Sequence, residues 1–154
     1  MGVITSDMRQ LVEEQQLGCF VASVCPDGTP NLSPKGATAV IDEDHLVFAD
    51  IHSPRTVANL RANPAVEINV VDPLTRKGFR FKGAARIVDA GPELGTLLDF
   101  YRARGSTSEK RCIVVVKVEA ASPLISPAYD DGTSEAAVVA KWRRYWLQLW
   151  DAGE

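Results

Sequence analysis

The chain has 154 residues, of which 45% are apolar and 24% are charged. This length and balance fit one globular domain over residues 1–154, and they exclude a low-complexity disordered chain and a fibrous one. Seventeen basic and 20 acidic residues give a net charge of −3. That charge argues against a nucleic-acid-binding protein, because such domains are usually basic.

The predicted elements follow one another without the regular strand–helix–strand alternation of a doubly wound sheet. Tight turns join the first strands, so we expect antiparallel neighbours, and closure into a barrel would remove the exposed edges. The expected fold is therefore mainly β with some α, a six-stranded antiparallel barrel with flanking short helices. In chain order we expect a helix from Thr5 or Ser6 to Gly18, strands at 19–24, 31–41 and 46–49, and a helix at 54–62. Strands at 65–71 and 78–88, a helix at 91–104 and a strand at 112–118 follow, and then a loop at 122–132 and a helix at about 134–150. The core strands would span about 18–118.

The cysteines and histidines give no sign of a disulfide framework or a metal site. Cys19, Cys25 and Cys112 are odd in number and form no CxxC pair, and His45 and His52 are the only histidines. We expect Cys19 and Cys112, which lie in apolar runs, to be core residues. No secretory signal and no membrane-length apolar stretch is recognisable, which predicts a cytoplasmic protein without a membrane partner.

The start of the helix at 54–62 is the first candidate binding site. Ser53 is a good N-cap and Pro54 a good first helical residue. The free N–H groups of a helix N-terminus, the hydroxyls of Ser53 and Thr56 and the guanidinium of Arg55 together suit a phosphate dianion. The alternative is an ordinary Ser-Pro cap followed by a solvated arginine.

Three further cations are candidates for the same site. Arg80 and Lys82 point to the same side of a strand whose other side carries Phe79 and Phe81. Lys35 interrupts the second strand, because proline and glycine flank it. These side chains would converge if their strands neighbour one another in the barrel; otherwise they are a solvated face and a protected edge.

The last predicted helix carries an aromatic stripe. Trp142, Tyr145, Trp146 and Trp150 recur at helical spacing. Such a stripe is more typical of a core or a dimer interface than of a base-stacking platform. No Gly-x-Ser-x-Gly and no phosphate-cradling Gly-x-x-x-x-Gly-Lys motif occurs, and the scattered Ser, His and Asp residues do not support triad catalysis.

Three segments resemble the pyridoxamine 5′-phosphate oxidase-like family of flavin-binding split barrels. They read DGTPNLSPKG, LVFADIHSPRTVANLRANPAVEINV and GFRFKGAARIV. The resemblance covers about 18–88 and, as a final strand, 112–118. It implies a split-barrel homodimer that binds FMN between its subunits and acts on a small molecule.

The resemblance also implies which residues contact the cofactor. Arg55 and Thr56 match the family's phosphate-binding pair, with threonine where the family has lysine, and Asp50 with Ile51 flanks the ring and the ribityl chain. The backbone at 35–38 matches the strand that reads the ring edge, where Lys35 is our candidate for stabilising the reduced flavin. The full expected set is Lys35, Gly36, Ala37, Thr38, Asp50, Ile51, Ser53, Arg55, Thr56, Asn59, Arg80 and Lys82, with Tyr129 and Trp142 expected from the partner subunit.

The chain departs from the family's pattern in two places. It lacks the family's glutamine near Gly78, so the cofactor phosphate would depend more on Arg80 or Lys82. It also has no histidine after His52, so it lacks the Arg-x-His that holds the substrate phosphate in true pyridoxamine phosphate oxidases. We therefore expect an FMN-dependent oxidoreductase other than a pyridoxamine phosphate oxidase. F420-dependent reduction is the second reading and haem binding a distant third, and a flavin-binding carrier or sensor without turnover stays open.

Overall fold

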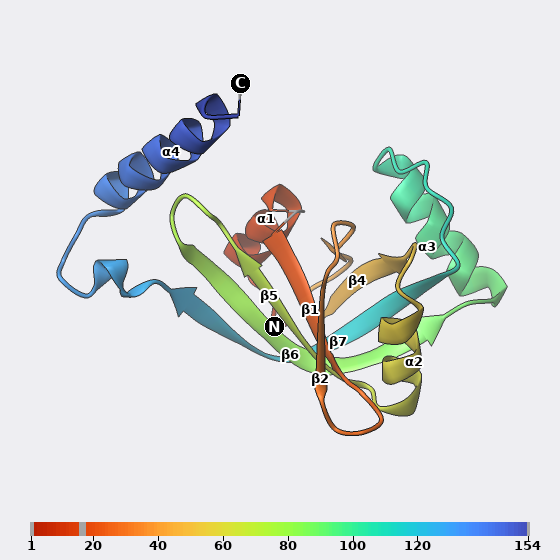
Figure 1. Ribbon diagram of the computed structural model, residues 1–154. Coiled ribbons are helices and arrows are strands. Elements are labelled where there is room, and N and C mark those ends of the chain that lie inside the picture. Colours follow the sequence, from red (N-terminus) through yellow and green to blue (C-terminus); the bar gives the residue numbers. More distant parts are fainter. Residues whose placement is uncertain (1, 16–17, 154) are drawn as a thin grey trace.

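The computed structural model describes residues 2–15 and 18–153. In this part of the chain seven antiparallel strands form one curved sheet in the order β2-β1-β5-β6-β7-β4-β3 (Figure 1). The strands are β1 (Cys19–Val24), β2 (Pro30–Pro34), β3 (Ala39–Val40), β4 (His45–Asp50), β5 (Ala65–Val71), β6 (Lys77–Val88) and β7 (Cys112–Ile125). The helices are α1 (Ser6–Glu14), α2 (Pro54–Ala62), α3 (Gly91–Ala103) and α4 (Glu135–Asp151), with a short 3-10 turn, η2 (Pro127–Tyr129).

The predicted six-strand barrel is wrong in its strand count and in its closure. The expected strand at 31–41 is split into β2 and β3, which do not pair with each other and form the two edges of an open sheet. Pro34 has no N–H to donate, and the turn that follows takes the chain from one edge to the other. Lys35 N–H still donates to the Cys19 carbonyl at 2.9 Å, so β1 directs the chain up to that point.

The pair β6 and β7 forms the long centre of the sheet. The register shifts between Lys82 and Gly83, opposite Val118 and Ala120. A Cβ at Gly83 would collide with the Lys117 carbonyl oxygen, so a glycine is needed where the two strands approach at this bulge. Strand β7 continues to Ile125, so the loop predicted at 122–132 begins too early; its first four residues extend the sheet.

Two apolar clusters cover opposite faces of the sheet. One packs α1 and α2 against the inside of the curve, around Phe48, Ile68 and Phe81. The other packs α3, through Leu97 and Tyr101, against the outer side of β4 and β7. The prediction that Cys19 and Cys112 are core residues is confirmed, since both are buried, and burial raises the pKa of the Cys19 thiol to about 11.

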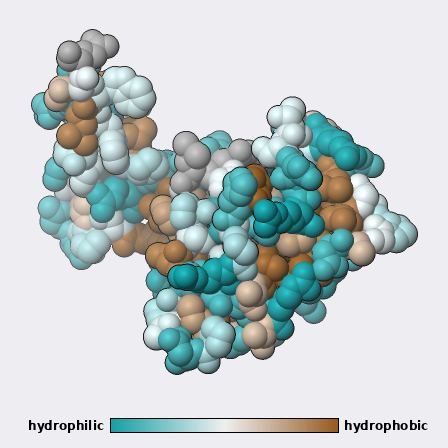
Figure 2. All heavy atoms as spheres, turned by 45° about the vertical axis from the view of Figure 1, so that its right-hand side comes forward, coloured by the Kyte–Doolittle hydropathy of each residue, from teal (hydrophilic) through white to brown (hydrophobic). Residues whose placement is uncertain are grey.

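Helix α4 projects from the sheet as an arm (Figures 1 and 2). Val138 is its one buried residue, whereas Trp150 is 81% exposed, so the core reading of the aromatic stripe is wrong and the interface reading stays a prediction. Lys77 Nζ pairs with Glu135 at 2.6 Å and the Arg76 guanidinium lies 4.3 Å from the Trp142 ring, which ties the arm to the β5–β6 turn. Within the described ranges, no helix is long and apolar enough to cross a bilayer.

Candidate cofactor site

The N-terminus of α2 follows directly from the end of β4. The buried Asp50 accepts the Ser53 N–H at 2.6 Å, and Pro54 begins the helix. Ser53 occupies the N-cap position, but its hydroxyl accepts no N–H group of the first turn, so the expected side-chain cap is not formed. Pro54 has no N–H group, and the Val57 N–H donates to the Ser53 carbonyl at 3.3 Å. The N–H groups of Arg55 and Thr56 therefore receive no side-chain cap, and uncapped N–H groups of this kind bind anions at helix N-termini.

Lys35 reaches this helix end from β2. Its Nζ donates to Ser33 Oγ at 2.6 Å and to Ser53 Oγ at 2.8 Å, and the residue is only 5% exposed. No carboxylate of the described residues lies within ion-pair distance of its ammonium. Burial lowers the pKa of Lys35, and the negative charge of Asp50 opposes that shift in part.

A cluster of buried and partly buried polar side chains packs between α2 and strands β1 and β2. Asn59 Nδ2 donates to Ser23 Oγ at 3.1 Å, and Asn31 Nδ2 donates to the same oxygen at 3.3 Å. Thr56 Oγ1 lies 3.4 Å from Asn31 Nδ2 and 3.3 Å from Ser33 Oγ. These amides and hydroxyls satisfy one another, so α2 is fixed in orientation against β1 and β2.

The segment expected to read the ring edge lines a cavity of about 400 Å³. Its Gly36, Ala37 and Thr38 face Ile51 across the cavity, and Tyr101 Oη donates to the Ala37 carbonyl at 2.7 Å. The far wall comes from the end of α3 and the following loop, through Tyr101, Arg104, Gly105, Ser106 and Ser108. Burial raises the pKa of the Tyr101 phenol well above its usual value, so this hydroxyl stays a donor.

Several of these residues were missed by sequence reasoning. Ser23, Asn31 and Ser33 belong to short strands. The alternation of side chains along a strand predicts which positions point inward, but it does not predict which side chains they contact. Ser23 is a polar residue at an inward position of an apolar strand, a signal that was available. The α3 wall carried no signal, because Arg104 and the glycine after it read as an ordinary helix end.

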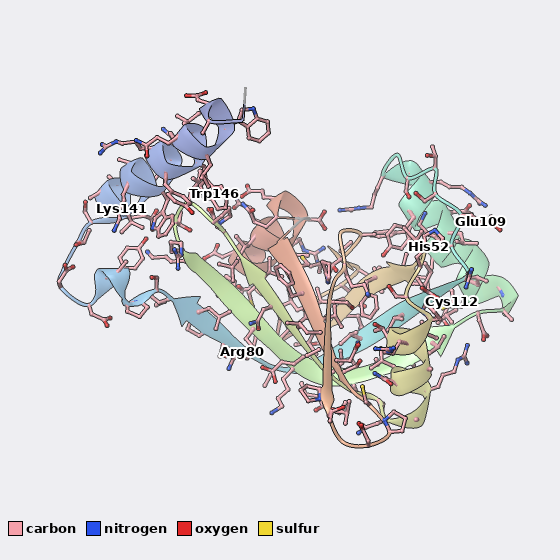
Figure 3. The ribbon with its side chains drawn as sticks, viewed as in Figure 1. His52, Arg80, Glu109, Cys112, Lys141 and Trp146 are labelled. Atoms are coloured by element: carbon pink, nitrogen blue, oxygen red, sulfur yellow. The ribbon has the colours of Figure 1, made fainter. Side chains whose placement is uncertain are left out.

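Arg80 and Lys82 do not join the α2 site within one chain. Strand β6 is separated from β2 by β1 and β5, and Arg80 Nε pairs with Glu67 Oε1 at 2.9 Å. Figure 3 shows Arg80 well apart from His52, which lies next to the start of α2. The expected convergence of these cations is therefore wrong for a single copy.

Tyr129 and Trp142 lie at the root of the arm. Tyr129 Oη donates to the Thr75 carbonyl at 2.5 Å, and Trp142 stacks under Arg76. Both residues therefore contact the β5–β6 turn of their own chain. Their contact with a partner subunit stays a prediction. Among residues 2–15 and 18–153, no group of three His, Cys, Asp or Glu side chains is placed to hold a metal.

The comparisons with known proteins assign the family. The sequence profile of the family described as pyridoxamine 5′-phosphate oxidase matches residues 4–124, and the chain belongs to that family. HupZ of Group A Streptococcus is 28% identical, with a TM-score of 0.72 over 80% of this chain and 95% of that one. A solved F420 reductase is 26% identical, with a TM-score of 0.59 over 77% of this chain and 98% of that one.

A third solved structure shares the fold at lower identity. It is an FMN-binding protein from Syntrophomonas wolfei subsp. wolfei, 17% identical, with a TM-score of 0.65 over 75% of this chain and 82% of that one. The search of curated proteins found no match. The family match ends at residue 124, so η2 and the arm lie outside the matched region.

Proposed function

We propose that this chain is an FMN-dependent oxidoreductase that transfers a hydride to or from a small molecule. The observation that carries the proposal is the uncapped N-terminus of α2, with Lys35, Ser53 and Arg55 around it, beside the cavity at Gly36–Ala39. A phosphate fits the first feature and a flat ring fits the second. The family, and the FMN-binding protein of the same fold, agree with this cofactor.

Each group of residues has a defined task in this proposal. The α2 N–H groups, Ser53 and Arg55 bind the phosphate, and the backbone of 36–38 with Ile51 positions the ring. The flavin supplies the hydride chemistry when bound, and the protein supplies binding, orientation and electrostatics. Tyr101 fixes the ring-edge segment through the Ala37 carbonyl, so the backbone groups of that segment keep one geometry.

We propose further that the working unit is a homodimer with FMN between the subunits. Three observations support it: the exposed apolar side chains Phe20 and Leu32 on β1 and β2, the unpartnered arm, and the position of Arg80 and Lys82 outside their own chain's site. In a dimer the two cations and the aromatic residues Tyr129 and Trp142 would serve the site of the partner. The substrate is one other than pyridoxamine phosphate, because no histidine follows His52 to form the family's Arg-x-His.

F420 is the second candidate cofactor, because the F420 reductase is 26% identical over most of its length. A flavin-binding carrier or sensor without turnover is the alternative to an enzyme. The spectrum of the purified protein and of the cofactor released by heat tests the proposal: the two-banded absorption of a flavin and release of FMN support it. A single deazaflavin absorption band would indicate that the bound cofactor is F420 and not FMN. A colourless protein that takes up neither cofactor would refute both candidates.

Turnover separates the enzyme from the carrier. The enzyme predicts rapid bleaching of the bound flavin by NADH, NADPH or a small donor, followed by repeated turnover with an acceptor. A carrier or sensor binds FMN tightly and oxidises neither nucleotide in the steady state. Light scattering of the loaded protein, with the mass of one chain, would contradict the two-subunit site.

A further inference from the structure

We infer that Lys35 makes the α2 site selective for a phosphate-bearing flavin, by holding the Ser53 hydroxyl away from the helix end. The inference rests on the proposed function and assigns a specificity-determining residue to it. Its basis is the contact of Lys35 Nζ with Ser53 Oγ at 2.8 Å together with the absent side-chain cap of α2.

The first step concerns what a serine does at an N-cap. Its oxygen ordinarily accepts a hydrogen bond from the second or third N–H group of the helix, so that this N–H group is no longer free for another acceptor. Ser53 instead accepts from the ammonium of Lys35, while its own N–H is taken by Asp50. The hydroxyl proton of Ser53 is thereby left to donate, and the N–H groups of Arg55 and Thr56 receive no side-chain cap.

The second step concerns the charge of Lys35. Lys35 as a residue is 5% exposed, and the hydrogen-bond acceptors of its ammonium are two neutral hydroxyls; Asp50 acts on it through space without a direct contact. A buried charge with no carboxylate in contact is unfavourable, so the ligand-free fold is destabilised by it. A phosphate group beside Ser53 would supply the missing negative charge within the same polar cluster.

These two steps predict effects of opposite sign for the removal of the ammonium. In Lys35→Met the side chain stays unbranched, is one heavy atom shorter and loses its charge, so the ligand-free protein becomes no less stable and Ser53 is released to cap α2. Affinity for FMN then falls, while affinity for riboflavin, which has the same ring and no phosphate, is maintained. A merely structural role of Lys35 predicts the reverse, with lower stability and equal losses for both ligands.

The experiment measures dissociation constants of FMN and riboflavin by quenching of flavin fluorescence, with urea unfolding of the ligand-free proteins alongside. For Lys35→Met we expect FMN to bind roughly tenfold to a hundredfold more weakly, as loss of a charge-assisted contact predicts, with less than about a threefold change for riboflavin. Ser53→Ala should also weaken FMN selectively, and Lys35→Met/Ser53→Ala should lose less than the product of the two single effects.

Two further outcomes decide the inference. Lys35→Arg keeps a cation and should retain part of the preference for FMN, even if Lys35→Met proves hard to fold. Equal weakening of FMN and riboflavin in both Lys35 variants would overturn the inference and leave the proposed flavin site standing. A wild-type protein that binds neither flavin would overturn the proposed function itself.

Discussion

The two ends of this molecule treat polar and apolar groups in opposite ways. At the start of α2 the polar side chains are buried and bonded to one another: Thr56 and Asn59 are 2% and 3% exposed. Along α4 the large apolar side chains are in solvent, with Trp146 at 47% and Trp150 at 81% exposed. Figure 3 shows Trp146 and Lys141 on the arm, and His52 on the segment between β4 and α2.

This difference indicates that the two regions suit different kinds of binding partner. Buried polar side chains are stable when they form hydrogen bonds with one another. In this cluster the Lys35 ammonium carries a positive charge without a carboxylate in contact, which suits a small anion at the helix end. An exposed aromatic helix is unbalanced in apolar area, which suits a macromolecular surface. Four experiments test this contrast, in order of decreasing expected effect.

The largest expected effect is on the packing of α2. Leu60 is 3% exposed on this helix, whereas Leu149 on α4 is 52% exposed. Leu60→Ala should lower the free energy of unfolding by about 2–5 kcal/mol, because it leaves a cavity in the core. Leu149→Ala is the matched control and should change it by less than about 0.5 kcal/mol. Urea unfolding of the ligand-free proteins measures both, and similar losses would mean that the arm is packed as tightly as α2.

The next effect concerns the sharing of a site between copies. Arg55→Ala and Arg80→Ala should each weaken FMN binding roughly tenfold or more if both side chains contact the phosphate. A dimer that combines the two variants places both substitutions in one site and leaves the other site intact. Mixed and refolded protein should therefore regain a fraction of wild-type sites in a fluorescence titration.

The control for that titration is Arg86→Ala. Arg86 lies on the same strand and pairs with Glu93 instead of facing the site, so its loss should leave FMN binding unchanged. If the mixture of Arg55 and Arg80 variants binds as the plain average of its components, Arg80 does not serve the site of the other copy.

A smaller effect is the pH dependence produced by Lys35. Burial lowers its pKa in the folded state below the ordinary value of 10.5. Between the two pKa values the unfolded chain binds more protons, so the free energy of unfolding rises with pH in that window. Below the lowered pKa the whole cost of the buried ammonium is present. The stability of the wild type should therefore rise relative to Lys35→Met as the pH approaches 10.5, in urea unfolding without ligand. A difference that does not vary with pH would show that the ammonium is not destabilised by burial.

The smallest effect is expected at the tip of the arm. Trp150→Ala should change the unfolding of the isolated chain by less than about 0.5 kcal/mol, because the ring contributes little buried area. The same substitution should weaken self-association if the arm packs on a second copy, which light scattering over a dilution series measures. No change in either quantity would remove Trp150 from the interface.

Much of the fold was predictable because local patterns set it. The strand at 65–71 and the strand that begins at Cys19 were predicted with the observed bounds, because alternating apolar residues stand between strong turn and stop signals. Helix α2 begins at Pro54 and ends before Asn63, as its proline signals predict. The bounds of β7 were not predictable, since its outer half has no apolar alternation and is paired only because β6 lies alongside it.

For the candidate site, the sequence by itself determined which segment we propose for an anion: a Ser-Pro-Arg-Thr helix start carries its own N–H groups, hydroxyls and cation. The tertiary structure decided which distant side chains meet it. Lys35 arrives there because Pro34 ends β2 above α2, and Arg80 does not because two strands intervene. The tertiary structure also decided that Thr56 is buried and that Trp150 is exposed. Local sequence sets dihedral angles and the periodicity of a single element, whereas strand order and helix packing depend on surfaces far apart in the chain.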